Sequence, residues 1–435
     1  MKKSICILYI SIVILCFSCS DWKQIGNDIY SEAPGDFAGM ATAINDDGSI
    51  IAIGSPYNDS NGIGSGHVRV FQNKENTWTT IGKDIKGLKT YDHFGSTLDI
   101  NANGNILAIG TMHSDVNGEN SGQVRVFKYH KKEWIQLGQN LNGSKAYDEF
   151  GYDISLSQDG KTLAIGAPHH ESTGNISSSV SIYTLNTVHN SWELLGDRIL
   201  GTTKSFKYTN NTFHENQIGK SIALSGDGRT LILNTTGNGE RGVITYKLID
   251  NQWVRIGNVI KMNHNLYNEI SLIGDVVSIN DDGSIIAIGY KDFQISKSSN
   301  ETKRGNILLI GCIQVFRLNS IDEWKQVGNT IYGTDLERFG EQLMLNASGN
   351  RLAVTSYGGD TAESGKDANF VSTFELANNN WKLYGEKIEL KRAYEEFDNS
   401  IAINNDGSII IVGNSAMDED NLTYGEVKIF KNKFK

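Results

Sequence analysis

The segment that decides the fold is residues 146–168, AYDEFGYDISLSQDGKTLAIGAP. It contains an alternating run that ends at Ser157, an Asp159-Gly160 pair, and an apolar run from Thr162 to Gly166. Two such runs joined by a two-residue turn of positive φ, which Asn, Asp and Gly tolerate best, predict a β-hairpin. The same turn recurs as Asp47-Gly48, Asn103-Gly104, Asp227-Gly228, Asp282-Gly283, Ser348-Gly349 and Asp406-Gly407. The chain is therefore built from repeats of a hairpin unit.

All seven tryptophans occur in one frame of this repeat, each shortly before a glycine, as in Trp22 to Gly26. They are Trp22, Trp78, Trp134, Trp192, Trp253, Trp324 and Trp381, spaced by 56, 56, 58, 61, 71 and 57 residues. An alternating run such as Val68 to Phe71 precedes six of them. Each unit thus holds four short strands, here named A to D in chain order. Seven units of four antiparallel strands predict an all-β, seven-bladed β-propeller.

The two ends of the repeat region are complementary. The last unit stops after the strand C run Val427 to Phe430 and has no tryptophan strand. The segment Trp22 to Ile29 is a strand D with no strands A to C before it. We therefore predict that this N-terminal strand completes the last blade, because the pairing removes two open sheet edges.

These repeats resemble the FG-GAP repeat, a propeller repeat that is also related to the integrin α-chain head. The residues that carry the resemblance are Phe150-Gly151, the Asp159-Gly160 turn and Gly166-Ala167-Pro168, with further Phe-Gly pairs at Phe94-Gly95 and Phe339-Gly340. The resemblance covers residues 22–435. It implies a propeller of the kind found in secreted and surface proteins.

Two groups of residues have the chemistry of metal ligands. Many FG-GAP blades carry a calcium loop of spaced carboxylates, because calcium takes six to eight oxygens. Here the turn Asn45 to Gly48 is followed at once by apolar residues and lacks a closing acid. His113 and the pair His169-His170 lie in neighbouring B to C loops and could ligate zinc, although two-histidine sites usually have helical spacing. We predict plain turns and surface loops with no metal and no cofactor, and the histidine site stays an open alternative.

The N-terminus has the pattern of a secretory signal. Met1-Lys2-Lys3 precedes an apolar stretch from Ile5 to Phe17, which is too short to span a bilayer as a helix. Ser18-Cys19 resembles the end of the bacterial lipobox, in the loose form tolerated in the Bacteroidetes group. We predict a lipoprotein-type signal peptide at residues 1–18, a single propeller domain at residues 19–435, and acylation of Cys19. This would anchor the protein in the cell envelope, at the outer membrane facing the periplasm or the cell surface; the alternative is ordinary signal cleavage beside an incidental cysteine.

Composition and motifs argue against two functional classes. With 40 Lys plus Arg against 50 Asp plus Glu the net charge is -10, whereas a nucleic-acid binder needs a basic face. No nucleophile elbow, His-Glu-x-x-His or phosphate-binding loop is present. Arg69 and Arg125 occupy equivalent strand C positions, which indicates a structural role rather than the arginine cluster of a sialidase. We predict a non-catalytic protein; the alternative is a carbohydrate-active propeller enzyme that uses loop-face carboxylates such as Asp148-Glu149.

Long loops identify the face that we expect to bind a ligand. In a propeller the D to A and B to C connections share one face, here called the loop face, and function on rigid scaffolds usually lies in such loops. The predicted binding residues are Tyr91, Asp92, Tyr147, Asp148, Glu149, Tyr267, Glu269, Lys291, Asp292, Tyr394 and Glu395. The expected partner is an envelope or extracellular protein, or a glycan. The open alternative is that the tyrosines pack between blades while the acids are solvated.

Overall fold

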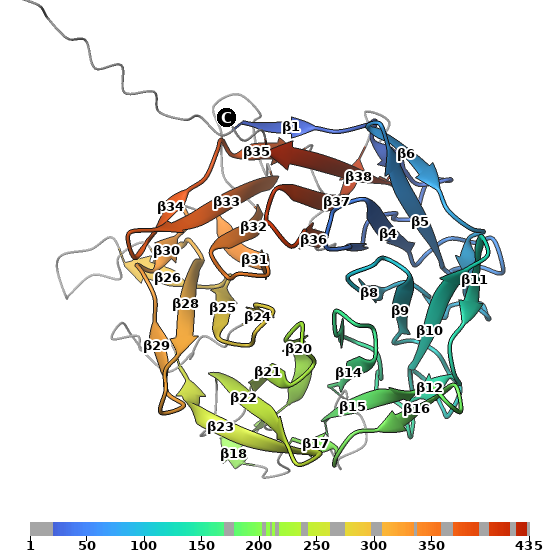
Figure 1. Ribbon diagram of the computed structural model, residues 1–435, viewed down its shortest axis with the longest axis horizontal. Coiled ribbons are helices and arrows are strands. Elements are labelled where there is room, and N and C mark those ends of the chain that lie inside the picture. The colour runs from blue at the N-terminus through green and yellow to red at the C-terminus, as the bar shows by residue number, and fades with distance from the viewer. Residues whose placement is uncertain are drawn as a thin grey trace, which may run out of the picture.

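The computed structural model describes residues 21–168, 178–201, 206–208, 211–213, 217–235, 242–261, 275–296, 307–334, 337–357, 369–390, 400–417 and 423–432. These residues form an all-β propeller of seven blades around a common axis (Figure 1). Each blade is an antiparallel sheet with strands A to D ordered from the axis to the rim, so the predicted fold class is confirmed. No helix in the described ranges is long and apolar enough to cross a membrane.

The strands fall into four sets by their place in the blade. The A strands are β3 (Ala41–Ile44), β8 (Thr97–Ile100), β13 (Ile154–Leu156), β20 (Ile218–Leu224), β24 (Val276–Ile279), β31 (Arg338–Leu345) and β36 (Ser400–Ile403). The B strands are β4 (Ile50–Ser55), β9 (Ile106–Thr111), β14 (Thr162–Ala167), β21 (Thr230–Thr235), β25 (Ile285–Tyr290), β32 (Arg351–Tyr357) and β37 (Ile409–Met417). The C strands are β5 (His67–Lys74), β10 (Gln123–His130), β15 (Ser179–Asn186), β22 (Gly242–Ile249), β28 (Cys312–Leu318), β33 (Asn369–Ala377) and β38 (Thr423–Asn432).

The D strands at the rim are mostly divided into two pieces that pair with the same C strand. They are β1 (Trp22–Gln24) with β2 (Ile29–Tyr30), β6 (Thr77–Thr80) with β7 (Ile85–Lys86), β11 (Glu133–Gln136) with β12 (Leu141–Asn142), β16 (Ser191–Leu194) with β17 (Ile199–Leu200), β23 (Gln252–Ile260), β29 (Trp324–Gln326) with β30 (Ile331–Tyr332), and β34 (Asn380–Leu383) with β35 (Ile388–Leu390). Two small hairpins lie in the long loops of the fourth and fifth units: β18 (Phe206–Tyr208) with β19 (Asn211–Phe213), and β26 (Gln294–Ser296) with β27 (Ile307–Leu309).

The seventh blade joins the two ends of the described chain. Its strands β36, β37 and β38 come from the C-terminal end, and its rim strands β1 and β2 come from the N-terminal end (Figure 1). β1 pairs antiparallel with β38, with Trp22 opposite Asn432 and Gln24 opposite Phe430. The pairing covers the outer edge of β38, which would otherwise be open to another strand.

A tryptophan ties each rim strand to the neighbouring blade. The Trp134 Nε1 donates a 3.0 Å hydrogen bond to the Ile81 carbonyl, and the Trp192 Nε1 donates a 2.9 Å bond to the Leu137 carbonyl. Corresponding bonds to backbone carbonyls are made by Trp22, Trp78, Trp253 and Trp381. The seventh tryptophan, Trp324, is buried with 6% of its surface exposed. The tryptophan frame seen in the sequence is therefore a set of contacts between blades.

In six repeats the glycine that follows the tryptophan lies against the indole of the next blade. These glycines are Gly26, Gly82, Gly138, Gly196, Gly257 and Gly328. Gly82 lies between β6 and β7 with φ +78°, and a Cβ atom at this position would lie only 2.6 Å from Cδ1 of Trp134. The left-handed backbone and the close contact both favour glycine. Tryptophan and glycine thus act together across the boundary between two blades.

The hydrophobic core is divided among the blade boundaries. The buried apolar residues of the described chain form seven clusters, and each combines strands of two neighbouring blades. Between the second and third blades, for example, Val124 and Val126 of β10 pack with Leu163 and Ile165 of β14. Every blade therefore buries both faces of its sheet, which explains the continuous apolar runs of the B strands.

The A to B turns differ from the predicted two-residue hairpins. The Asn45 N–H donates to the Ile50 carbonyl at 3.0 Å, so four residues lie between the paired positions. Only Gly48 has positive φ, at +72°, while the Asp47 carboxylate accepts a 2.8 Å hydrogen bond from the Ser49 N–H. This hydrogen bond lowers the pKa of Asp47 against the opposing effect of its burial. Aspartate recurs here because its side chain caps the turn.

Backbone hydrogen bonds link the seven A to B turns into a closed ring. The Ala102 N–H donates to the Gln158 carbonyl at 3.0 Å, and the Gln158 N–H donates to the Gly226 carbonyl at 2.9 Å. The series continues through the remaining turns at Asp227, Asp281, Ala347, Asn405 and Asp46 and returns to Ala102. This ring lies at the face opposite the loop face and holds the inner ends of the blades together.

Candidate functional site

The loop face is organised by backbone hydrogen bonds between its two kinds of loop. In the first unit the Tyr91 N–H donates to the Ile63 carbonyl at 2.8 Å, and the His93 N–H donates to the Gly64 carbonyl at 3.0 Å. Both bonds recur 56 residues further along the chain. In these two units the B to C loop is therefore joined to the D to A loop that follows it, and the two loops form one continuous surface.

Two of the predicted acids shape these loops from within. Asp92 and Asp148 are only 6% and 7% exposed. The Asp148 Oδ2 accepts hydrogen bonds from the Ser144 N–H at 2.8 Å, the Ser144 Oγ at 2.6 Å and the Lys145 N–H at 3.0 Å. Burial raises the pKa of Asp92, and a hydrogen bond from its own loop opposes that shift. These carboxylates hold the loop conformation, so the open alternative that they are simply solvated does not describe them.

Tyr91, Tyr147 and Glu149 have strained backbone conformations in these loops. Tyr91 is 59% exposed with φ +62°, and the equivalent Tyr147 has φ +64°. Glu149 has φ +50°. The Tyr147 hydroxyl donates a hydrogen bond to the Glu119 carboxylate, which raises the pKa of Tyr147. Bulky residues with positive φ are uncommon and concentrate where a side chain must be held in a set place.

Lys291 and Asp292 begin the B to C loop of the fifth blade, directly after β25. The Lys291 N–H donates to Asp275 Oδ2 at 3.2 Å, and its Nζ lies 4.0 Å from Glu341 Oε1. Burial raises the pKa of Asp275 to about 6, against the opposing charge of Lys291. Asp292 is exposed. Lys291 thus links its loop to the half-buried Asp275 and the buried Glu341, while Asp292 stays at the surface.

The other predicted residues fall where the structure gives no description. Cys19, His169, His170, Tyr267, Glu269, Tyr394 and Glu395 lie outside the described residues, as do residues 1–18.

A row of four aromatic rings crosses the loop face over the first two blades. The ring centroids of Phe37 and Tyr57 are 5.3 Å apart, and those of Tyr57 and His93 are 4.4 Å apart. His93 then contacts His113, with 2.7 Å between their Nδ1 atoms. Phe37 and His93 come from D to A loops, and Tyr57 and His113 come from B to C loops, so the row alternates between the two loop types. All four rings are half-buried.

The two histidines of the row are held neutral. Burial, together with the neighbouring His113, lowers the pKa of His93 to about 4. Burial also lowers the pKa of His113, against the opposing charge of Asp115. At neutral pH one Nδ1 therefore donates its proton to the lone pair of the other. The structure pairs His113 with His93, which the sequence analysis did not single out.

Repeat spacing could have identified this row. Phe37 and His93 are 56 residues apart, as are Tyr57 and His113. Phe37 and His93 also share positive φ, at +53° and +54°. Phe37 and His93 therefore occupy the same position of the repeat, as do Tyr57 and His113.

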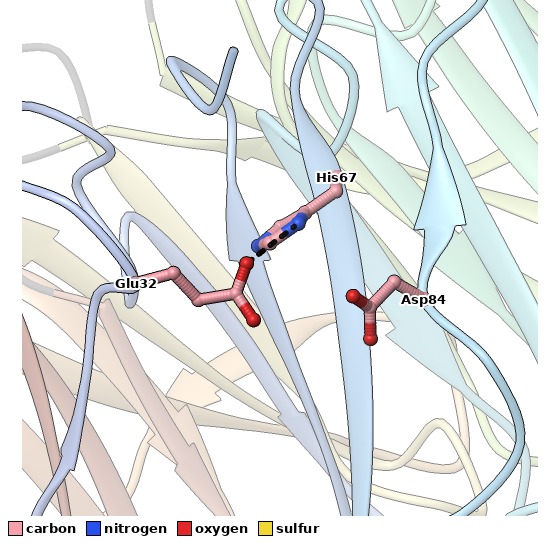
Figure 2. Close-up of side chains that lie close together, drawn as sticks. All are labelled: Glu32, His67 and Asp84. Carbon is pink, nitrogen blue, oxygen red and sulfur yellow. Dashed lines mark ion pairs between the residues drawn. The ribbon is translucent and has the colours of Figure 1, made fainter. Parts of the chain in front are cut away.

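A second group of side chains lies where the N-terminal strand meets the first blade (Figure 2). It consists of Glu32 from the loop after β2, His67 at the start of β5, and Asp84 just before β7. One ligand atom from each residue lies within 4.8 Å of the others. Figure 2 shows the two carboxylates on either side of the imidazole. We call this group the seam cluster.

The central histidine of the seam cluster is isolated from solvent and from hydrogen-bonding partners. His67 is 0% exposed, and neither its Nδ1 nor its Nε2 has a hydrogen-bond partner in the described chain. Its Nδ1 lies 3.9 Å from Glu32 Oε2, which is beyond hydrogen-bond distance. Burial lowers the pKa of His67, and the charge of Arg69 adds to this, while Glu32 and Asp84 oppose it.

The neighbouring arginine has a structural role that repeats in the next blade. The Arg69 Nη2 donates to the Tyr30 carbonyl at 2.7 Å, and the Arg125 Nη2 donates to the Lys86 carbonyl at 2.8 Å. Arg69 also lies 3.7 Å from Glu32 Oε1 through its Nη1. The structural role predicted for Arg69 and Arg125 from their equivalent positions is therefore confirmed.

The seam cluster does not recur in the second blade. The residues 56 positions further on are Leu88, Gln123 and Asn140, in place of Glu32, His67 and Asp84. Gln123 donates a 2.9 Å hydrogen bond to Asn142. His67 and Gln123 therefore occupy the same backbone position in successive blades but differ in side-chain chemistry. This difference within the repeat could have identified His67 from the sequence.

Comparison with known proteins shows the fold and no more. No family model matches the chain, and no curated protein matches it. Among solved structures, hydrazine synthase of Kuenenia stuttgartiensis is similar over 89% of this chain and 95% of its own, with a TM-score of 0.50 and 14% identity. A protein from Lactobacillus plantarum is similar over 86% of this chain and 94% of its own, with a TM-score of 0.53 and 12% identity. The similarity over most of both chains shows a shared architecture, and at identities this low it shows nothing beyond the fold. The class of protein is therefore the seven-bladed β-propeller.

Proposed function

We propose that this protein is a non-catalytic binding module of the cell envelope, which presents its loop face to a glycan or to a partner protein. The observation that carries the proposal is the row formed by Phe37, Tyr57, His93 and His113. Half-buried rings held by rigid loops offer large contact area at a small loss of side-chain entropy. A sugar ring or a flat side chain that stacks on the row would replace water over its exposed parts.

The buried acids support the non-catalytic form of the proposal. A glycosidase needs two carboxyl groups that reach the scissile bond, about 5–10 Å apart. Asp92 and Asp148 instead accept hydrogen bonds from the backbone of their own loops. A carbohydrate-active enzyme remains the alternative. It would release new reducing ends from a bound glycan, whereas a binding module would not.

The resemblance to FG-GAP repeats and the secretory pattern at residues 1–18 support a place in the envelope. In our proposal Cys19 carries the lipid, three residues before Trp22. Trp22 pairs with Asn432 at the far end of β38, on the side of the C to D turns. The lipid would therefore hold that side near the membrane, and the loop face would point away from it.

The test compares Tyr57→Ala with Tyr332→Ala. Tyr332 is a 54% exposed tyrosine on the rim strand β30, remote from the row, and serves as the matched control. Binding to immobilised envelope polysaccharides and to cross-linked envelope proteins would be measured for both variants. We expect Tyr57→Ala to weaken binding at least about tenfold, the effect of losing about 1.4 kcal/mol of stacking, while the control binds as the natural protein does. Equal binding by Tyr57→Ala and the natural protein would remove the row from the proposal.

A further inference from the structure

We propose that the seam cluster is a binding site for a divalent first-row transition metal ion, with Glu32, His67 and Asp84 as its protein ligands. This site is separate from the aromatic row and does not depend on the proposed function. It also departs from the expectation of a metal-free protein that the sequence suggested.

The first observation behind the proposal is the orphaned imidazole. Buried polar atoms in folded proteins nearly always have a partner, so each exception needs an explanation. His67 has no exposed surface and two ring nitrogens without hydrogen bonds. The carboxylates of Glu32 and Asp84 lie beside its ring (Figure 2). A metal ion that accepts a nitrogen lone pair would satisfy the ring in the place where it is held.

The second observation is the distance among the three donors. Their ligand atoms lie within 4.8 Å of one another. Donors placed about 2.0–2.2 Å from a tetrahedral zinc ion stand roughly 3.3–3.6 Å apart. The group must therefore contract by about 1 Å, which rotation of the exposed Glu32 side chain and the partly exposed Asp84 side chain can supply. His67, at the start of β5, stays fixed.

The third observation is that the two oxygens of the Glu32 carboxylate face different neighbours. Its Oε1 lies 3.7 Å from the Arg69 Nη1, and its Oε2 faces His67. Arg69 is itself held by the Tyr30 carbonyl. Groups that orient a ligand from behind are a regular feature of protein metal sites. Here the guanidinium directs one oxygen away from the site and leaves the other for the ion.

The donor set defines the class of ion. One imidazole and two carboxylates suit zinc and its divalent neighbours, whereas calcium prefers oxygen ligands alone and copper(I) prefers sulfur. Three protein ligands leave an open position for water on the exposed Glu32 side. Because Glu32 follows the N-terminal strand and the other two belong to the first blade, the ion would also join these parts of the ring.

The second blade supplies the matched variant. Gln123 occupies the position of His67 in the repeat and folds with the same strand pairing. His67→Gln therefore replaces the proposed ligand with the residue that the architecture accepts there. His113→Gln removes a histidine of the aromatic row and serves as the control for zinc bound elsewhere.

The experiment is a zinc titration of the full chain after treatment with a chelator, followed by calorimetry and by competition with a chromophoric chelator. We expect one ion per chain at the seam cluster, at least 100-fold weaker binding by His67→Gln, and no change in His113→Gln. X-ray absorption should give one imidazole nitrogen and two carboxylate oxygens at about 2.0–2.2 Å. Zinc should raise the melting temperature of the natural protein and leave that of His67→Gln unchanged.

Several results would overturn the proposal. These are an absence of zinc binding by the natural protein, equal affinity in His67→Gln, or a loss confined to His113→Gln, which would assign the ion to the aromatic row. Circular dichroism of each variant without metal checks its fold. If His67→Gln does not fold, Asp84→Asn decides the question, because it changes a partly exposed side chain and no strand residue; unchanged zinc affinity in that variant would reject the site.

Discussion

The glycine and tryptophan of each repeat make a quantitative prediction about the stability of the ring. Gly82 has φ +78°, and a Cβ atom there would lie 2.6 Å from Trp134 Cδ1 and 3.1 Å from its Nε1. Alanine in left-handed backbone costs about 1–2 kcal/mol, and forcing an extra carbon into a packed contact costs about 1–3 kcal/mol more. Gly82→Ala should therefore lower the free energy of unfolding by about 2–5 kcal/mol.

Gly35 is the matched control for this substitution. Its φ is +85°, but a Cβ atom there would have nothing within 4 Å. Gly35→Ala should therefore lower the free energy of unfolding by only the backbone contribution, about 1–2 kcal/mol. Unfolding in guanidinium chloride, followed by tryptophan fluorescence, gives the free energy of unfolding of both variants. The two values can be compared when the free energy falls with denaturant concentration at the same slope.

The backbone and packing contributions to the cost of Gly82→Ala can be separated by removing the indole of Trp134. In a Trp134→Ala background, Gly82→Ala should cost no more than Gly35→Ala, because the crowded atom is gone. Equal losses for Gly82→Ala and Gly35→Ala in the natural background would refute the packing argument. The same conclusion would follow if removal of Trp134 gave Gly82→Ala no relief.

Two further predictions concern carboxyl groups that are half-buried, as in Asp99, or buried, as in Asp148. Burial raises the pKa of Asp99 and of Asp153 to about 7. The folded protein therefore keeps protons that the unfolded chain releases near pH 4. The free energy of unfolding that Asp99 contributes should fall as pH rises from about 4 to about 7, by up to about 1.4 kcal/mol per pH unit. Urea unfolding at several pH values should thus show the advantage of the natural protein over Asp99→Ala shrinking across this range, and a constant difference would contradict it. Asp148→Ala leaves three hydrogen-bond donors of its loop without an acceptor. It should lower the free energy of unfolding by about 1–3 kcal/mol in the same measurement, and Asp148→Asn should recover part of the loss. Equal stability of Asp148→Ala and the natural protein would show that the loop does not depend on this carboxylate.

Periodic features of the sequence were enough to predict the architecture. The seven tryptophans and the recurring Asp-Gly turns fix the number of units, and alternation fixes the four strands within each. These signals are reliable because they are local: each hairpin is set by residues a few positions apart. The turn type was predicted less well, because Asp47 acts through its side chain on the Ser49 N–H and not through a positive φ of its own.

The candidate sites were harder to predict because they combine residues from different loops and units. Asp92 was predicted as a binding residue of the loop face, but its burial depends on the loop that folds over it. His113 was singled out as well, yet its partner His93 comes from another loop of the same face. His67 was not considered at all, since a single histidine at the start of a strand gives no local signal.

The fold could be predicted from the order of the residues, because repeated short-range patterns specify each blade and closure of the ring covers the edges of the first and last units. Which side chains meet is known only from the folded arrangement of the blades. Closure brings Glu32, from the loop after the N-terminal strand, beside His67 and Asp84 of the first blade. Such a meeting depends on the distance between segments in space, which the spacing of residues along the chain does not express.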